Sequence, residues 1–228
     1  MKRSEINAQI KKAIAFIDRQ GFALPPFTQW TPDDWKTKGH EYDEIRDNML
    51  GWDVTDYGQG RFEELGLVLI TIRNGNQHMT DKYDKPYAEK IFIIQQKQVS
   101  PMHFHWSKME DIINRGGGNL MVRLYNRTQD NKLSNTDVTV RQDGRVYQVP
   151  AGTWVRLMPG ESISLEKEVF HEIIVEPGTG DVLVGEVSLC NDDNTDNYFL
   201  EPLGRFPAIE EDEPAFRLLC TEYPKATD

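Results

Sequence analysis

Between residues 65 and 189 the sequence is a series of short apolar runs, and this pattern limits the chain to few folds. The runs are rich in β-branched and aromatic residues, and Gly, Pro, Asn or Asp bounds each of them, as is typical of strands and turns. Many short strands predict a sandwich or barrel. We therefore expect an all-β protein with strands at 65–73, 90–95, 102–105, 120–125, 138–140, 146–149, 154–157, 162–165, 171–175 and 182–189.

The first fifty residues show helical patterns instead. Apolar residues recur at helical spacing between Ser4, which we expect to be an N-cap, and Gly21, which ends the pattern. Thr31 followed by Pro32 predicts a second helix start, and the helical pattern continues toward Arg46. The sequence therefore predicts a largely helical N-terminal extension.

Length and composition indicate one folded unit. The chain has 228 residues, with 38% hydrophobic and 28% charged residues, which is typical of a globular protein. A β-barrel of this length is often a single domain. We expect a helical extension over 1–64 that packs on the barrel, the barrel itself over 65–190, and a loop-rich segment over 191–228.

The charge of the chain excludes one class of partner. A net charge of −11 is opposite to the clustered Lys and Arg that nucleic-acid binding requires. The sequence contains no apolar stretch of the length of a signal peptide or a membrane span. We expect no nucleic-acid or membrane partner and a cytoplasmic location.

Two histidines in one predicted strand are candidate metal ligands. His103 and His105 are two residues apart, so both side chains face the same side of a strand, and Glu110 follows after a turn. Histidines in strands are as often ordinary hydrogen-bonded residues. The carboxylate five residues after the pair favours metal binding.

These positions resemble the first sequence motif of the cupin superfamily. That motif is His-x-His, three or four residues, Glu, six residues and Gly, and it is matched by His103, His105, Glu110 and Gly117. Its leading Gly is replaced by Lys97, so one turn position departs from the pattern.

The second cupin motif is Gly, five residues, Pro-x-Gly, two residues and His. Gly160 and His171 match it, whereas its Pro and inner Gly are replaced by Glu166 and Glu168. The resemblance covers about residues 65–190. It implies that His171 is the fourth ligand and that the fold is a jelly-roll β-barrel, in which inward side chains converge on one ion.

The implied ligand set limits the metal and its chemistry. Three imidazoles and one carboxylate, without a thiolate, favour manganese, iron, cobalt, nickel or zinc. Either oxygen activation at a redox metal or Lewis-acid polarisation of a carbonyl and its neighbouring hydroxyl is compatible with such a centre. Neighbouring residues must distinguish between the two.

Three charged residues near the predicted ion are candidates for taking part in the reaction. Lys90 and Lys108 are cations near the predicted ion, although a strand-edge lysine and a solvated turn residue are equally good interpretations. Glu186 lies in a strand otherwise rich in Val and Leu, where a buried carboxylate is costly unless it has a function.

Three segments also resemble the D-lyxose isomerase family: 52–58 (Trp-Asp-Val-Thr-Asp-Tyr-Gly), 185–188 (Gly-Glu-Val-Ser), and 191–197 with Asn191-Asp192-Asp193 and Asp196-Asn197. This likeness extends over most of the chain. It implies isomerisation of D-lyxose to D-xylulose, together with D-mannose to D-fructose, a manganese-type ion and a homodimer.

This chemistry gives the candidate residues roles. Glu186 is the expected base that carries the proton between C1 and C2 through an enediol, and Glu110 is the weaker candidate because a metal-bound carboxylate is less basic. The expected oxyanion or hydroxyl partners are Lys108 and Lys90, and the candidates for binding distal hydroxyls are Asp196 and Arg205. The alternatives are a cupin dioxygenase and a sugar-binding cupin without catalysis.

Overall fold

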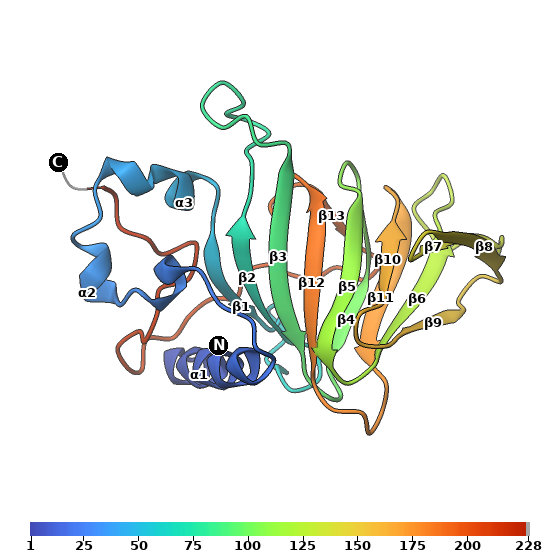
Figure 1. The fold of residues 1–228 in the computed structure, drawn as a ribbon, viewed down its shortest axis with the longest axis horizontal. Coiled ribbons are helices and arrows are strands. Elements are labelled where there is room, and N and C mark those ends of the chain that lie inside the picture. Colours follow the sequence, from blue (N-terminus) through green and yellow to red (C-terminus); the bar gives the residue numbers. More distant parts are fainter. Residues whose placement is uncertain (227–228) are drawn as a thin grey trace.

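The computed structural model describes residues 1–226, which form two antiparallel β-sheets with helices at one end (Figure 1). The larger sheet has the strand order β1-β2-β3-β12-β5-β10-β7-β8, and the smaller has β13-β4-β11-β6-β9. The strands are β1 Gly51–Thr55, β2 Leu67–Arg73, β3 Tyr87–Ile94, β4 Val99–His105, β5 Glu110–Gly117, β6 Leu120–Asn126, β7 Val138–Gln142, β8 Arg145–Val149, β9 Trp154–Leu157, β10 Ser162–Leu165, β11 Val169–Val175, β12 Val182–Leu189 and β13 Asn197–Phe199. The predicted all-β class is confirmed.

The main core lies between the two sheets. Leu69 and Phe92 from the larger sheet meet Val122 and Ile173 from the smaller one in a single buried cluster. Buried and partly exposed residues alternate along β6, as expected for a strand with one face in a core and one face outside. The charged residues that also point inward therefore need partners inside the barrel.

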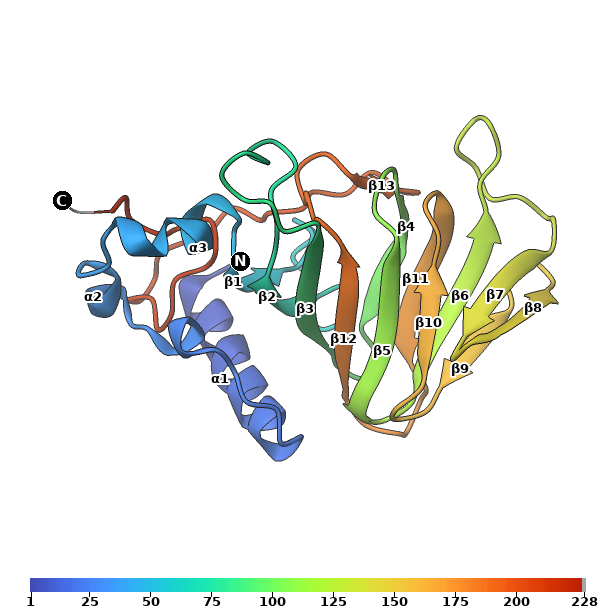
Figure 2. The same ribbon diagram turned by 45° about the horizontal axis from the view of Figure 1, so that its top comes forward.

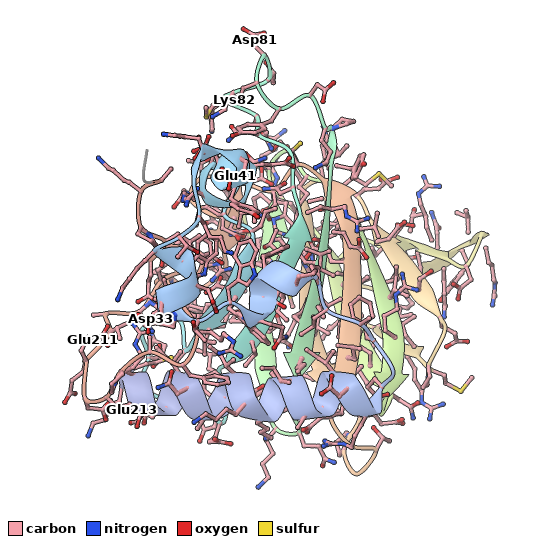
Figure 3. The ribbon with its side chains drawn as sticks, turned by 60° about the vertical axis from the view of Figure 1, so that its left-hand side comes forward. Asp33, Glu41, Asp81, Lys82, Glu211 and Glu213 are labelled. Carbon is pink, nitrogen blue, oxygen red and sulfur yellow. The ribbon has the colours of Figure 1, made fainter. Side chains whose placement is uncertain are left out.

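A second core lies on the outer face of the larger sheet. The helix α1 (Arg3–Arg19) lies against this face (Figure 3). Its Ile6 and Ile10 belong to one apolar cluster with Val68 and Ile91. Strands β2, β3 and β12 are thus covered on both faces over much of their length. This explains why β2 is almost continuously apolar, since a strand that is buried on both faces has no polar side.

The C-terminal segment lies beside α1 and β1, at the end of the larger sheet opposite β7 and β8 (Figure 2). Arg3 at the start of α1 is 2% exposed and forms ion pairs with Glu211 and Glu222 of this segment. Both ends of the chain are thus tied together. A buried arginine is stable there because its charge is paired.

The helical region differs from its prediction in two respects. Helix α1 begins at Arg3 with Lys2 as its N-cap, whereas Ser4 binds Asp212 instead. The expected continuous helix toward Arg46 is wrong. The cap at Thr31 is present, but the helical region is divided into η1 Pro26–Gln29, α2 Pro32–Trp35, η2 His40–Tyr42 and α3 Asp43–Asp47.

Three strands were not predicted: β1, β5 and β13. Strand β1 pairs with β2, and β13 pairs with β4, so each flanking segment adds one strand to a sheet. Strand β13 has only three residues, and its pairing depends on β4 and not on a local pattern. The extensions are therefore integrated with the barrel.

Two turns have a left-handed backbone conformation at non-glycine residues, at positions where the cupin motifs have glycine. Lys97 has φ +76° and Glu168 has φ +61°, both in the left-handed region, at the positions where the motifs have Gly. Gly160, which does match its motif, has φ +98°. At both positions where the motif glycine is missing, another residue thus adopts the conformation that favours glycine.

Replacing Lys97 with glycine should raise the free energy of unfolding by about 0.5–1 kcal/mol. Relief of the left-handed strain, about 1–2 kcal/mol, exceeds the extra unfolded-state entropy of glycine. Lys97 is exposed, so no packing is lost. The matched variant Gly160→Ala should lower the stability by about 1–2 kcal/mol, since its Cβ would meet no atom within 4 Å and only the backbone is strained. Urea denaturation of both variants at equal metal loading measures this, and a destabilised Lys97→Gly would contradict it.

Candidate active site

Three histidines meet on two neighbouring strands of the smaller sheet. His103 and His105 lie on β4, and His171 lies on β11 directly opposite His103 in the antiparallel register. The candidate ligand atoms of the three side chains all lie within 4.8 Å of one another. The spacing of two residues and the strand pairing together bring the three imidazoles to one point.

Glu110, the first residue of β5, reaches the same point from the larger sheet. Its Oε1 lies 3.4 Å from Nε2 of His105 and 3.1 Å from Nε2 of His171. Its side chain is 2% exposed. The structure therefore gathers all four residues that were predicted as metal ligands.

Hydrogen bonds orient the imidazoles toward this centre. Nδ1 of His103 donates to the backbone oxygen of Pro101 at 2.6 Å, and Nδ1 of His171 donates to that of Val169 at 3.0 Å. The proton therefore resides on Nδ1, which leaves the Nε2 lone pair of each ring for a ligand bond. Backbone partners of this kind are typical of metal-binding histidines.

His105 is held differently. Its buried Nδ1 has no hydrogen-bond partner among residues 1–226, and Oδ2 of Asp196 lies 3.8 Å away from it. The same Asp196 accepts hydrogen bonds from the backbone N–H groups of Ser107 and Lys108 at 2.7 and 3.2 Å. Asp196 thus holds the turn between β4 and β5, which carries one histidine on one side and Glu110 on the other.

The four side chains fit a divalent ion. Ligand atoms about 2.1 Å from one ion and at right angles to each other lie about 3 Å apart. The two distances from Glu110 to Nε2 atoms are of this size. Burial, with the neighbouring imidazoles of His171 and His105, lowers the pKa of His103 well below its usual range, so its ring is neutral as a ligand must be.

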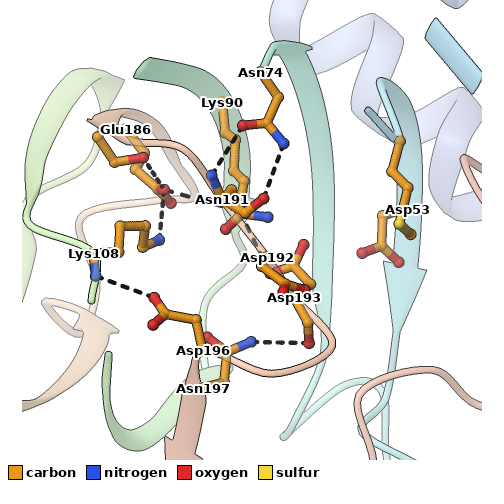
Figure 4. Close-up of polar contacts among 12 residues, drawn as sticks. Asp53, Asn74, Lys90, Lys108, Glu186, Asn191, Asp192, Asp193, Asp196 and Asn197 are labelled. Atoms are coloured by element: carbon orange, nitrogen blue, oxygen red, sulfur yellow. Dashed lines mark hydrogen bonds and ion pairs between the residues drawn. The ribbon is translucent and has the colours of Figure 1, made fainter. Parts of the chain in front are cut away.

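A buried lysine joins the ligand set to a second carboxylate. Nζ of Lys108 lies 2.7 Å from Oε2 of Glu110 and 2.8 Å from Oε1 of Glu186 on β12; Figure 4 shows Lys108 and Glu186 pointing toward each other. Burial by itself would lower the pKa of Lys108, but the two carboxylates outweigh it and raise that pKa. Lys108 is therefore an ammonium group at neutral pH.

Lys90 approaches Glu186 from the next strand. The two residues are directly opposite each other on β3 and β12, and Nζ of Lys90 lies 3.9 Å from Oε1 of Glu186. This Nζ also donates to Oδ1 of Asn191 at 2.5 Å and lies 3.5 Å from Oδ1 of Asp193. Lys90 is 2% exposed and lies on a central strand, so it is not a solvent-exposed lysine at the edge of a sheet.

One cavity connects these groups. It is lined by the three histidines, Glu110, both lysines and Glu186, and also by Tyr57, Asp193, Asn197 and Arg205. Of the two residues expected to bind distal hydroxyls, Arg205 lines the cavity. Asp196 does not line it and instead binds the turn between β4 and β5 from the loop that precedes β13. The cavity can thus present a metal, a carboxylate base and two ammonium groups to one small polar molecule.

Two cavity residues, Tyr57 and Asp193, were not predicted from the sequence. Both lie in segments that were identified by resemblance, 52–58 and 191–197, but no role followed from their local pattern. Several carboxylates lie close together in the second segment, and only the folded loop shows which of them faces the cavity. The resemblance to a family was the one signal that could have indicated them.

The model of the D-lyxose isomerase family matches residues 1–223. The chain is 48% identical over 224 residues to the D-lyxose/D-mannose isomerase of Escherichia coli O157:H7. It is 49% identical over 224 residues to the D-lyxose/D-mannose isomerase of Serratia proteamaculans. Each comparison covers 98% of this chain and 98% of the relative.

The fold of this chain is similar to that of solved structures. The ligand-free L-ribose isomerase of Cellulomonas parahominis superposes with a TM-score of 0.61 at 14% identity, over 92% of this chain and 98% of that one. The L-ribose isomerase of Acinetobacter sp. DL28 in complex with L-ribose gives 0.60 at 14% identity over the same shares. The fold class is confirmed by this likeness, and the family match over nearly the whole sequence shows that the chain belongs to the D-lyxose isomerase family.

Proposed function

We propose that this chain is a metal-dependent aldose–ketose isomerase that converts D-lyxose to D-xylulose and D-mannose to D-fructose. One observation carries the proposal. Glu186 lies in the same cavity as the three histidines and Glu110, and Lys108 bridges the two carboxylates. The names of the two relatives, each a D-lyxose/D-mannose isomerase, support the choice of sugars.

Glu186 is the proposed proton carrier. Its carboxylate removes the proton from C2 of the aldose, which gives an enediolate with its negative charge on O1. The hydroxyl proton of O2 passes to O1, and the carboxylate returns the carbon-bound proton to C1, which leaves the ketose carbonyl at C2. Buried at 5% exposure, the carboxylate is shielded from bulk water, so a proton taken from the substrate can be retained. Lys108 and Ser188 orient it, the latter by donating to Oε1 at 3.2 Å.

The two lysines have the complementary role. As ammonium groups beside the base, Lys108 and Lys90 donate to the substrate oxygens on which negative charge develops. Lys108 also holds Glu110 and Glu186 at fixed positions relative to each other, because its Nζ contacts both. Positioning and charge stabilisation are thus combined in one side chain.

The proposed ligands are His103, His105, Glu110 and His171, and the proposed ion is Mn²⁺. A divalent ion at this position supplies a Lewis acid that polarises the carbonyl and neighbouring hydroxyl oxygens of the sugar. The nitrogen and carboxylate donors, with no thiolate among them, support a metal such as manganese. Because it binds the ion, Glu110 is the weaker candidate for the base.

The test is an anaerobic assay with D-lyxose and D-mannose, using protein stripped by a chelator and reloaded with Mn²⁺. We expect ketose in the reloaded sample and none in the stripped one. Oxygen uptake in an aerobic sample, without ketose, would favour a dioxygenase. Sugar binding without any turnover would favour a non-catalytic cupin.

Oligomeric state and location are separate proposals. The homodimer and the cytoplasmic location expected from the sequence are retained, and light scattering tests the first directly. None of the helices over residues 1–226 is long and apolar enough to span a membrane. A monomer in solution at micromolar concentration would contradict the dimer.

A further inference from the structure

Arg205 has an unused donor at the cavity. Its Nη2 donates to Oδ2 of Asp53 at 2.5 Å and to Oδ2 of Asp193 at 3.3 Å. Its Nη1 is buried and has no hydrogen-bond partner in the part of the chain that the structure describes, although Arg205 lines the cavity. Leaving a buried guanidinium nitrogen unpaired is costly, so this nitrogen is suited to an acceptor that enters with a ligand.

The segment 52–58 holds Arg205 at both ends. Asp53 binds its guanidinium, and Thr55 donates from Oγ1 to its backbone oxygen at 2.8 Å. The backbone N–H of Tyr57 donates in turn to Oγ1 of Thr55 at 2.9 Å, and Tyr57 itself lines the cavity. The side chain and backbone of Arg205 are therefore fixed before any ligand binds, which lowers the entropy cost of binding.

Asp193 places an acceptor next to this donor. Both side chains line the cavity, and Asp193 is held between Arg205 and Lys90. Burial by itself would raise the pKa of Asp193, but Lys90 and Arg205 lower it, so the carboxylate is ionised. A sugar hydroxyl can donate to the carboxylate and accept from the guanidinium, so the pair matches one hydroxyl group.

The pair lies away from the reacting end of the cavity. Lys90 separates it from the base, with Nζ 3.9 Å from Oε1 of Glu186 on one side and 3.5 Å from Oδ1 of Asp193 on the other. Figure 4 shows Glu186 and Lys108 on one side of Lys90 and Asp193 on the other. A sugar with C1 and C2 beside Glu186 thus extends its other carbons toward Asp193 and Arg205.

We infer that Arg205 and Asp193 bind the C4 hydroxyl of the sugar and select its configuration, and that Asp53 is a positioning residue for Arg205. D-lyxose and D-mannose have the same configuration at C2, C3 and C4, and the hexose has one more carbon beyond. A site that accepts both sugars can select the configuration of the C4 hydroxyl, but it cannot require a terminal hydroxyl at a fixed position. The inference rests on the proposed function for the orientation of the sugar.

A pair of C4 epimers tests this. L-ribose differs from D-lyxose only at C4, so kcat/KM for the two sugars is compared in the Mn²⁺-loaded wild type and in Arg205→Lys, Asp193→Asn and Asp53→Asn. We expect the wild type to prefer D-lyxose. Arg205→Lys keeps a cation but removes the planar guanidinium, whose Nη1 is the proposed donor to the C4 hydroxyl. It should therefore lower kcat/KM for D-lyxose about 10- to 100-fold and lower kcat/KM for L-ribose by much less. Asp193→Asn should also reduce the preference, and Asp53→Asn should raise KM for D-lyxose several-fold with little change in kcat.

Arg141→Lys is the matched control, because Arg141 is exposed and pairs with Glu166 outside the cavity. It should leave both sugars unaffected. An equal loss for both epimers in Arg205→Lys would mean a structural role and would overturn the inference, as would an unchanged preference. If the wild type turns over neither sugar, the proposed function fails, and calorimetric binding then decides. A binding preference for D-lyxose that Arg205→Lys abolishes supports the subsite, whereas equal binding by both proteins overturns it.

Discussion

Glu186→Gln should lower kcat for D-lyxose by about 10³-fold, within the range of general acid–base catalysis. Glutamine keeps the size and the oxygen that faces Lys108 and Ser188, but it has no basicity with which to take a proton from C2. Metal content should be unchanged, because Glu186 is not among the proposed ligands. Steady-state assays with metal analysis of the same sample measure both.

Isotope exchange separates this role from a general loss of activity. The substrate for this test is D-lyxose deuterated at C2. Wild-type enzyme should transfer this deuterium to C1 or exchange it with solvent, whereas Glu186→Gln should leave it at C2. The control is Glu166→Gln, since Glu166 is an exposed glutamate that pairs with Arg141. Full activity in Glu186→Gln would transfer the base role to another group, with Glu110 as the next candidate.

His171→Ala should remove both metal and turnover. Loss of one of four ligands should weaken Mn²⁺ binding by at least about 100-fold, since even the partners of ligands contribute 10- to 100-fold. The side chain is not part of the apolar core between the sheets, so the far-ultraviolet circular dichroism of the barrel should remain. Metal titration by calorimetry and the ketose assay measure the two losses.

Thermal unfolding provides a second measurement of the same change. An ion at about 100 times its Kd stabilises the native state by about 2.7 kcal/mol, so added Mn²⁺ should raise the Tm of the wild type and leave that of His171→Ala unchanged. His40→Ala is the matched control and should behave like the wild type, because His40 is an exposed residue of η2. Metal binding and full rate in His171→Ala would exclude the proposed ligand set.

Local sequence patterns predicted much of the fold. Ten of the strands were expected from short β-branched runs, and the two-residue spacing of His103 and His105 in a strand implied that both imidazoles face one side. The cupin motifs indicated Glu110 and His171, and the structure brings both to the histidine pair. The strand predictions and the common face of the two histidines followed from strand alternation, which is a local property of the backbone.

The remaining features depended on contacts between distant segments. The three-residue strand β13 exists because β4 offers it an edge, and the left-handed turn at Lys97 persists without the glycine that would have indicated it. Asp193 and Asp196 are three positions apart in the same polar segment. Asp193 lines the cavity, whereas Asp196 binds the turn between β4 and β5. Side-chain direction in an irregular loop is decided by its tertiary partners, which local pattern does not encode.

The sequence by itself determined the class of fold, the family and the four proposed metal-ligand residues, because each of these depends on residue type at fixed spacing. Only the tertiary structure decided how the charges are paired. Lys108 pairs with Glu110 and with Glu186, which is 78 positions further along the chain than Lys108, and Arg205 pairs with Asp53 and Asp193. Buried charges are stable only with a partner, and that partner depends on how the strands and their connecting loops pack in the folded chain.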